Sequence, residues 1–163
     1  MRAIHTQVEA KSTNLIETPI LNYLHPIVGA VTSQLPANKL PDQGFIQSAY
    51  HYIKRNVRPV YTVDEFQPVS ETLRKQKGSC SQRMACLEAL SRANEIPTRV
   101  RGLHIDGRFW YPRFRLSRPF IPKTILLALP QFHIEGSCVD FDELFWRYGR
   151  IGTESTGGVQ QFR

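Results

Sequence analysis

Residues 77–86 read KGSCSQRMAC, and this short stretch locates the central helix of the chain. Ser79 is followed three residues later by Gln82, the spacing of a capping box, so Ser79 is the expected N-cap and Cys80 the first helical residue. Apolar residues then recur at helical spacing until Ile96 and Pro97 interrupt the run. The sequence therefore predicts a largely buried helix over residues 80–94 that begins with a cysteine.

A cysteine at that position has a chemical consequence. The unpaired N–H groups and the dipole at a helix N-terminus lower the pKa of a thiol there, and the same N–H groups can bind an oxyanion. Cys80 is therefore the candidate nucleophile, whereas Cys86 and Cys138 are predicted to be small buried hydrophobic residues. Neighbours of Cys80 that could contact a substrate are Ser79, Ser81 and Arg83.

Further elements follow from the periodicity and the breakers. A helix is predicted over residues 42–57, with Asp42 as its N-cap and Pro59 as its stop, and a shorter helical turn over residues 70–74. After Pro97 the pattern changes to strands: one predicted hairpin turns at Asp106-Gly107, because that pair supplies the positive φ angles of a type I′ turn.

A second predicted hairpin pairs residues 125–134 with residues 137–141 around the turn Glu135-Gly136. Pro130 within its first strand indicates an edge position or a bulge. Residues 142–148 are expected to form a short closing helix. Helices followed by antiparallel strands predict an α+β fold, divided into an N-terminal arm (1–40), a core domain (41–150) and a loose C-terminal tail (151–163).

Composition and charge limit the function classes. Three cysteines in 163 residues argue against a disulfide framework and favour a reducing, cytoplasmic environment, and the chain has no run of 18 apolar residues that would suit a membrane. A net charge of +7 favours an anionic substrate or an acidic partner, or simply a solvated basic face. Nucleic acid is disfavoured, because the arginines between residues 99 and 118 alternate with apolar residues instead of clustering.

Two quoted segments carry a family resemblance. Gly78-Ser79-Cys80 and the following SRANEIPTRV at residues 91–100 resemble the transglutaminase-like superfamily, whose core helix carries the pattern G-x-C and later L-R-A-x-G-I-P-A-R. Residues 53–57 and 70–73 are similar to the segments that lead into that helix, and the similarity spans about residues 45–145. The sequence departs from the family at Glu95, where glycine is usual.

The resemblance implies a cysteine protease-like fold in which a Cys-His-Asp triad joins the helix to an antiparallel sheet, with Cys80 as acyl acceptor. Aligned on Gly136, the family pattern places Leu127 at the histidine position and Asp142 at the aspartate position. In this register Leu127 lies opposite Leu144. A missing general base typically costs a factor of about 10²–10⁴, so ordinary triad chemistry is in doubt. Asp140, expected to face Gln131, is the alternative acid.

Other residues could complete the site. His104 could approach Cys80 if its hairpin folds over the helix end. His133 lies six residues from Leu127, about 20 Å along a strand, so it is a candidate only if the register of the hairpin is different. An aromatic and basic group, Trp110, Tyr111 and Arg113, either packs or forms a wall that binds an anion. No histidine has metal-ligand spacing with another histidine or a cysteine, so we expect neither a metal nor another cofactor.

Two hypotheses result. In the first, the chain is a repurposed transglutaminase-like enzyme, suited to a biosynthetic pathway, that transfers or displaces a group at Cys80. Its substrate would be an anionic small molecule or a molecule tethered to a carrier protein, and a second protein subunit could supply the missing base. In the second, the chain is a non-catalytic subunit that binds an acidic partner or ligand.

Overall fold

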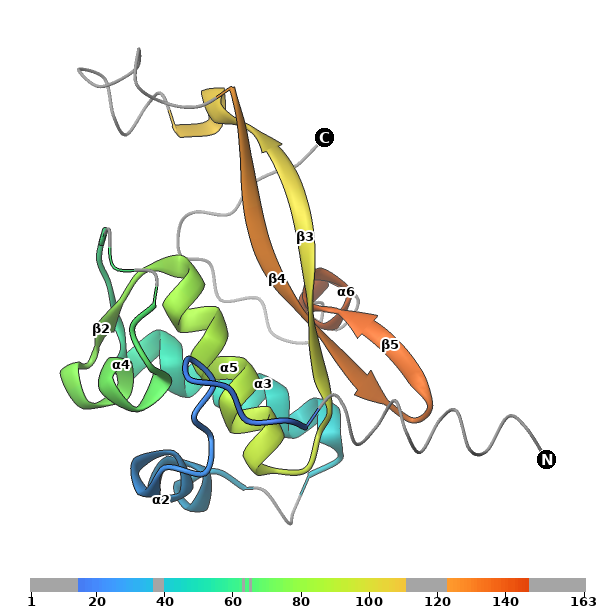
Figure 1. The fold of residues 1–163 in the computed structure, drawn as a ribbon. Helices are drawn as coiled ribbons and strands as arrows, with labels where there is room; N and C mark the ends of the chain where they lie inside the picture. Colours follow the sequence, from blue (N-terminus) through green and yellow to red (C-terminus); the bar gives the residue numbers. More distant parts are fainter. Residues whose placement is uncertain (1–14, 37–39, 63, 65, 111–122, 147–163) are drawn as a thin grey trace.

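The computed structural model describes residues 15–36, 40–62, 64, 66–110 and 123–146 (Figure 1). In chain order its elements are α2 (Pro26–Gln34), α3 (Asp42–Asn56), β1 (Arg58–Pro59), α4 (Val69–Lys75), β2 (Lys77–Gly78), α5 (Cys80–Ala93), β3 (Thr98–Asp106), a 3₁₀-helix (Gly107–Trp110), β4 (Thr124–Ile134), β5 (Ser137–Asp140) and α6 (Phe141–Trp146). A parallel pair β1-β2 and a three-stranded antiparallel sheet, in the order β3-β4-β5, accompany the helices. The α+β prediction is confirmed.

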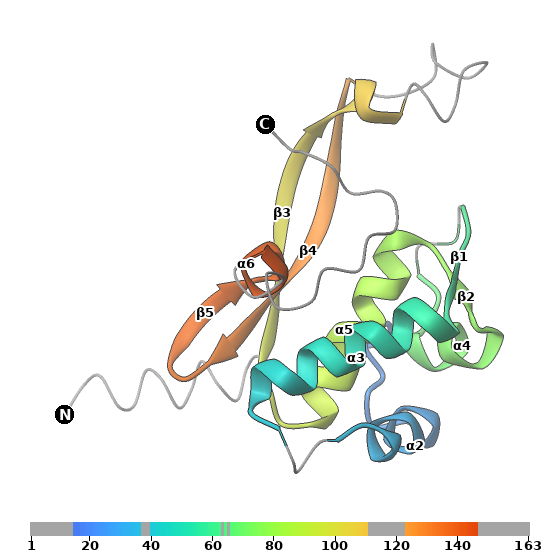
Figure 2. The ribbon, with the colours of Figure 1, turned by 180° about the vertical axis from the view of Figure 1, so that it is seen from behind.

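Helix α5 is the centre of this arrangement, because α2, α3, α4 and the strands β3 and β4 contact it, whereas α6 packs on α3, β4 and β5 (Figures 1 and 2). It begins as the sequence predicts: the side chain of Ser79 accepts a hydrogen bond from the N–H of Gln82, and the side chain of Gln82 accepts one from the N–H of Ser79. Leu87 and Leu90 are fully buried along its length. The capping box therefore fixes where the helix starts, and the apolar stripe fixes which side of it is covered.

The end of α5 has an equally definite form. The N–H of Ile96 donates to the carbonyl of Ser91, and the N–H of Glu95 donates to the carbonyl of Arg92. These two bonds make a Schellman motif, in which the residue after the C-cap takes left-handed angles. Glu95 has a φ of 61°, so it adopts the conformation for which glycine is best suited. The sequence thus departs from the family pattern at a position where the backbone favours glycine.

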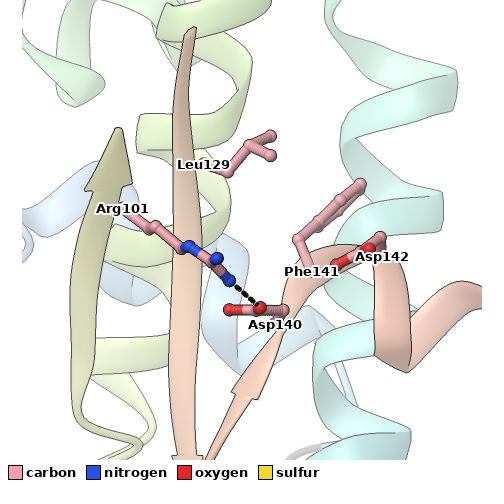
Figure 3. A pocket seen from close by; sticks show the side chains of 5 residues that line it. All are labelled: Arg101, Leu129, Asp140, Phe141 and Asp142. Carbon is pink, nitrogen blue, oxygen red and sulfur yellow. Dashed lines mark hydrogen bonds and ion pairs between the residues drawn. The ribbon is translucent and has the colours of Figure 1, made fainter. Parts of the chain in front are cut away.

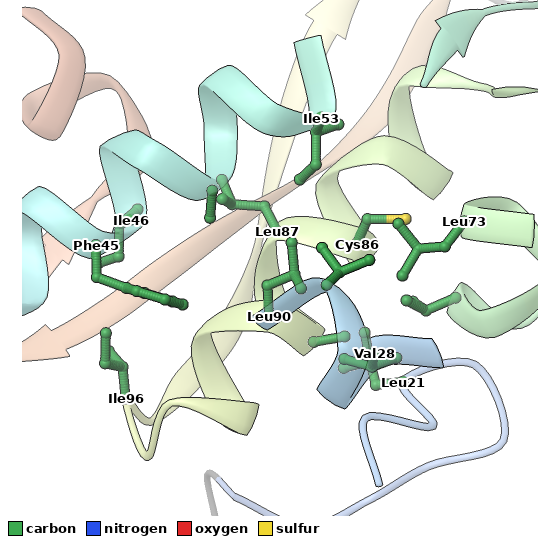
Figure 4. Close-up of a cluster of buried hydrophobic side chains, with 14 of the residues drawn as sticks. Leu21, Val28, Phe45, Ile46, Ile53, Leu73, Cys86, Leu87, Leu90 and Ile96 are labelled. Atoms are coloured by element: carbon green, nitrogen blue, oxygen red, sulfur yellow. The ribbon is translucent and has the colours of Figure 1, made fainter. Parts of the chain in front are cut away.

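The hydrophobic core lies between α5 and its neighbours (Figure 4). Its fully buried large side chains come from six elements and the adjoining loops; among them are Val28 of α2, Phe45 of α3, Val69 of α4, Leu90 of α5, Phe132 of β4 and Leu144 of α6. The predicted helix at residues 42–57 is present as α3, but its N-cap is Pro41, and Asp42 is already helical without a capping side chain. The helical turn at residues 70–74 and the closing helix are present as α4 and α6.

The first predicted hairpin is wrong. Neither Asp106 nor Gly107 has a positive φ angle, so the type I′ turn does not form there. The carboxylate of Asp106 instead accepts a hydrogen bond from the N–H of Arg108 at 2.8 Å, which starts the 3₁₀-helix. Strand β3 pairs over its whole length with β4, from Thr98 opposite Phe132 to Asp106 opposite Thr124.

The second predicted hairpin is confirmed. Glu135 and Gly136 both have positive φ angles, 50° and 80°, and they join β4 to β5. Pro130 lies one residue beyond Gln131, the last residue of β4 that pairs with β5, so the strand is locally an edge at the proline. The expected pairing of Leu127 with Leu144 is wrong, because β5 ends at Asp140 and Leu144 belongs to α6.

Candidate functional site

Cys80 is exposed at the first position of α5. The cap below it uses part of the helix N-terminus: Ser79 Oγ accepts from the N–H of Gln82 at 3.2 Å, and the Ser79 carbonyl accepts from the N–H of Arg83 at 2.9 Å. Within the part of the chain that the structure describes, the N–H groups of Cys80 and Ser81 have no hydrogen-bond acceptor. An exposed sulfur therefore lies beside two backbone donors that could bind an oxyanion.

The other two cysteines have different environments. Cys86 is fully buried, as predicted, and desolvation raises the pKa of its thiol to about 12, an effect that the charge of Arg83 opposes. Cys138 is exposed on β5, so the prediction that it is a buried hydrophobic residue is wrong. It lies on a strand whose side chains are exposed or half-buried, which its position in the sequence did not reveal.

Residues predicted to contact a substrate have mixed positions. Ser79 is 7% exposed and its hydroxyl is held in the helix cap, whereas Ser81 is half-buried in the first turn. Arg83 is half-buried, and its Nε is buried without a hydrogen-bond partner among the described residues. Trp110 ends the 3₁₀-helix far along the chain from Cys80, and Tyr111 and Arg113 lie outside the described residues.

A loop that the sequence analysis did not single out adjoins the start of α5. The Nε2 of Gln82 donates to the carbonyl oxygen of Asp64 at 2.6 Å, which ties this loop to the helix. The loop carries Phe66, which is 81% exposed, and the N–H of Phe66 is fixed by the carboxylate of Asp64 at 3.2 Å. A phenylalanine isolated among polar loop residues was the sequence signal that could have identified this surface.

The antiparallel sheet has two distinct faces. Thr98 points toward α5, because its Oγ1 accepts from Arg92 at 2.8 Å and donates to Glu88 at 3.1 Å. Its cross-strand partner Phe132 is fully buried. Since side chains alternate along a strand, the even-numbered residues of β3 and β4 share this face, and the odd-numbered residues point away from α5.

This alternation separates the candidate residues. His104 lies on the face that points toward α5. Cys80 is about 12 Å along the helix from Glu88, the residue that contacts Thr98, and His104 is about 20 Å along β3 from Thr98. Strand β3 runs from the end of α5 back toward its start, and the β3–β4 ribbon extends past the helix (Figure 1). By these lengths His104 is displaced from Thr98 in the same direction as Cys80 is from Glu88.

His133 lies at the other end of the sheet. It follows Phe132, the partner of Thr98, and its side chain contacts Cys138 instead of Cys80. The two candidate histidines are thus separated both by face and by position along the strands.

The two candidate carboxylates lie on the face that points away from α5. Asp140 pairs with Arg101 of β3 and accepts a hydrogen bond from Gln131, its cross-strand partner, as predicted. Together with Leu129 and Phe141, the residues Arg101, Asp140 and Asp142 line a pocket (Figure 3). Asp142 is exposed in the first turn of α6. Cys80 is not among the residues that line this pocket.

No Cys-His-Asp triad is therefore assembled among the described residues, since Asp140 binds a guanidinium and an amide in place of an imidazole. In the same residues, no three histidine, cysteine, aspartate or glutamate side chains form a group that could hold a metal ion. Nor does any helix within the described ranges have the length and apolar character needed to cross a membrane.

An exposed cysteine that opens the central helix of an α+β domain, packed on an antiparallel sheet, defines a class of cysteine-nucleophile folds. The family model of the transglutaminase-like superfamily matches residues 29–117, more than half of the chain. The chain therefore belongs to the transglutaminase-like superfamily. The matched segment ends before β4, so Leu127, Asp140 and Asp142 lie outside it. No curated protein and no solved structure matches the chain.

Proposed function

We propose that the chain is a transglutaminase-like enzyme in which Cys80 accepts an acyl group from an activated donor. The observation that carries this proposal is the exposed sulfur of Cys80 at the capped start of α5, next to the free N–H groups of Cys80 and Ser81. A nucleophile and an oxyanion site are the two parts that acyl transfer needs first. The family to which the chain belongs supports the same assignment.

The donor is best described as a thioester, such as an acyl group tethered to a carrier protein. In the acyl-transfer step the sulfur of Cys80 bonds to the acyl carbon, the carbon–sulfur bond of the donor breaks, and the carrier thiolate departs. A thiolate leaves without a strong acid catalyst, which suits a site in which, by the alignment on Gly136, Leu127 takes the place of the triad histidine. His104 is the histidine that we assign as acceptor of the Cys80 proton, because it shares a sheet face with α5.

The surfaces near Cys80 support this donor class. Phe66, 81% exposed on the loop bonded to Gln82, offers an apolar wall for an acyl chain. Farther from Cys80, on the face of the sheet that points away from α5, the exposed guanidinium groups of Arg99 and Arg101 suit the acidic surface of a carrier or partner subunit. A role in biosynthesis, in the cytoplasm, is consistent with such a donor.

The proposal is tested with an acyl thioester of N-acetylcysteamine as the probe. The chain is incubated with the probe and digested, and the mass of each cysteine-containing peptide is measured by mass spectrometry. We expect the acyl mass on the Cys80 peptide, its loss in Cys80→Ser, its retention in Cys138→Ser, and a slower appearance in His104→Ala than in His133→Ala. Absence of acylation at Cys80 in the folded wild-type chain would contradict the proposal.

The second candidate is a non-catalytic subunit that binds an acidic partner. It is favoured by one observation, the absence of an assembled triad from the described residues. Binding of an acidic carrier protein that is unchanged in Cys80→Ser, combined with no acyl transfer at Cys80, would select this function over the enzyme.

A further inference from the structure

A second thiol of the chain has what Cys80 lacks, a histidine in contact with it. Cys138 of β5 and His133 of β4 are direct cross-strand partners, and Cys138 Sγ lies 3.8 Å from His133 Nδ1. The cysteine is exposed and the histidine is half-buried. An imidazole at this distance can accept the proton of a thiol as the sulfur attacks, which is the arrangement of an activated cysteine.

An exposed cation, Arg99, lies on the same face of the sheet as this pair. Cys138 and His133 lie on the face of the sheet that points away from α5, and the next row on that face, about 7 Å along the strands, is Arg99, Gln131 and Asp140. The Nε of Arg99 donates to Gln131 Oε1 at 2.7 Å, which holds the exposed guanidinium in place. Asp140 is already paired with Arg101, so Arg99 remains available to an incoming carboxylate.

We propose that Cys138 and His133 form a thiol-modification site that takes one half of a low-molecular-weight disulfide carrying carboxylate groups. The sulfur of Cys138 attacks one sulfur of the disulfide, the disulfide bond breaks, and a new sulfur–sulfur bond forms to Cys138. The thiol proton passes to His133, and the other half of the disulfide leaves as a thiolate. The disulfide is the oxidant, and Cys138 is oxidised in the exchange.

This site is independent of the function proposed at Cys80. His133 and Cys138 lie beyond the Thr98–Phe132 pair, at the end of the sheet opposite to the end near Cys80, and on the other face. Either site can therefore fail its test without affecting the other.

The test compares two disulfides of opposite charge on the full chain. Oxidised glutathione, which carries carboxylates, and cystamine, which is cationic, are each added to the reduced protein, and adduct formation is followed separately on the three cysteine peptides. We expect Cys138 to form the glutathione adduct fastest. The rate should fall by about tenfold or more in His133→Ala and stay unchanged in His51→Ala, a matched removal of an exposed histidine on α3, outside both sites.

Arg99→Ala should slow the reaction with oxidised glutathione while leaving that with cystamine unchanged or faster, because the guanidinium attracts carboxylates and repels amines. Cys86 reports on folding in every variant, since it is fully buried and stays unmodified only while the chain is folded. Equal rates at Cys138 in wild type and in a folded His133→Ala variant, or a preference for cystamine, would overturn the proposal.

Discussion

At the scale of single residues, Glu95 shows how a departure from a family pattern is tolerated. The Schellman motif at the end of α5 requires left-handed angles at this position, and Glu95 adopts them with a φ of 61°. The family's glycine has no Cβ and pays no steric cost there. The glutamate is exposed, so its side chain offers little compensation. The backbone at this position is consequently a local source of strain.

Glu95→Gly should therefore stabilise the chain by about 1 kcal/mol, a gain reduced by the greater freedom of glycine in the unfolded state. Glu95→Ala is the matched control, because it removes the carboxylate but keeps a Cβ, and it should give no such gain. Urea unfolding of the three proteins measures the difference. A Glu95→Gly protein no more stable than Glu95→Ala would show that the position is not strained.

Cys86 provides a prediction on pH. Burial raises the pKa of its thiol from the ordinary 9.0 to about 12. A raised pKa in the folded state means that its stabilisation is complete below pH 9 and is lost as the pH rises toward 12. Between pH 7 and pH 10, which is one unit above the ordinary pKa, the wild-type chain should lose about 1 kcal/mol more unfolding free energy than Cys86→Ala loses. Parallel loss in both proteins, in urea unfolding with a reductant present, would contradict the burial of an ionisable thiol.

At the scale of elements, Arg92 joins three segments of the chain. Its Nη1 donates to the carbonyl of Ile16 at 2.6 Å, its Nη2 to the carbonyl of Thr98, and its Nε to the Thr98 hydroxyl. Glu88, one turn earlier on α5, lies 3.7 Å from the same guanidinium. Burial raises the pKa of Glu88, against the opposing effects of Arg92 and Thr98. The contact between α5 and β3 therefore depends on one buried cation.

Arg92→Ala should cost about 3 kcal/mol of unfolding free energy or more, because it leaves a buried carboxylate and two carbonyls without their partner. Arg74→Ala is the control: Arg74 also pairs with a glutamate on its own helix, but its side chain is 66% exposed, so stability should hardly change. Chemical denaturation of both variants measures the difference. If the two substitutions lowered the unfolding free energy by similar amounts, burial would not determine how much an arginine–glutamate pair contributes to stability.

The sequence predicted an element correctly where the residues that form its hydrogen bonds or turn angles are neighbours in the chain. The capping box placed the start of α5, and Glu135-Gly136 placed the turn of the second hairpin, because these bonds and angles belong to neighbouring residues. Asp106-Gly107 carries the same kind of signal, yet β3 pairs with β4 beyond a long connection. The turn preference of two residues contributes little free energy compared with the nine cross-strand pairs between β3 and β4. The sequence alone does not show which strand β3 pairs with.

At the scale of the whole molecule, the face of the sheet on which each residue lies determines which candidate residues can come together in one site. Sequence reasoning placed Cys80 at the start of the central helix and Asp140 opposite Gln131, as the structure has them. It could not tell which face of the sheet α5 covers, since that depends on the contacts of Thr98 with Glu88 and Arg92 across the layers. His104 and Asp140 consequently lie on opposite faces, and the basic residues Arg99 and Arg101 gather on the face away from α5.

The most direct test of the account is the rate at which iodoacetamide alkylates Cys80 in the folded protein near pH 7. If the start of α5 activates the sulfur, Cys80 should react far faster than free cysteine under the same conditions, while the buried Cys86 remains unmodified. If Cys80 reacts no faster than free cysteine, its thiol is an ordinary one, and the claim that it is the nucleophile of a transglutaminase-like enzyme is contradicted.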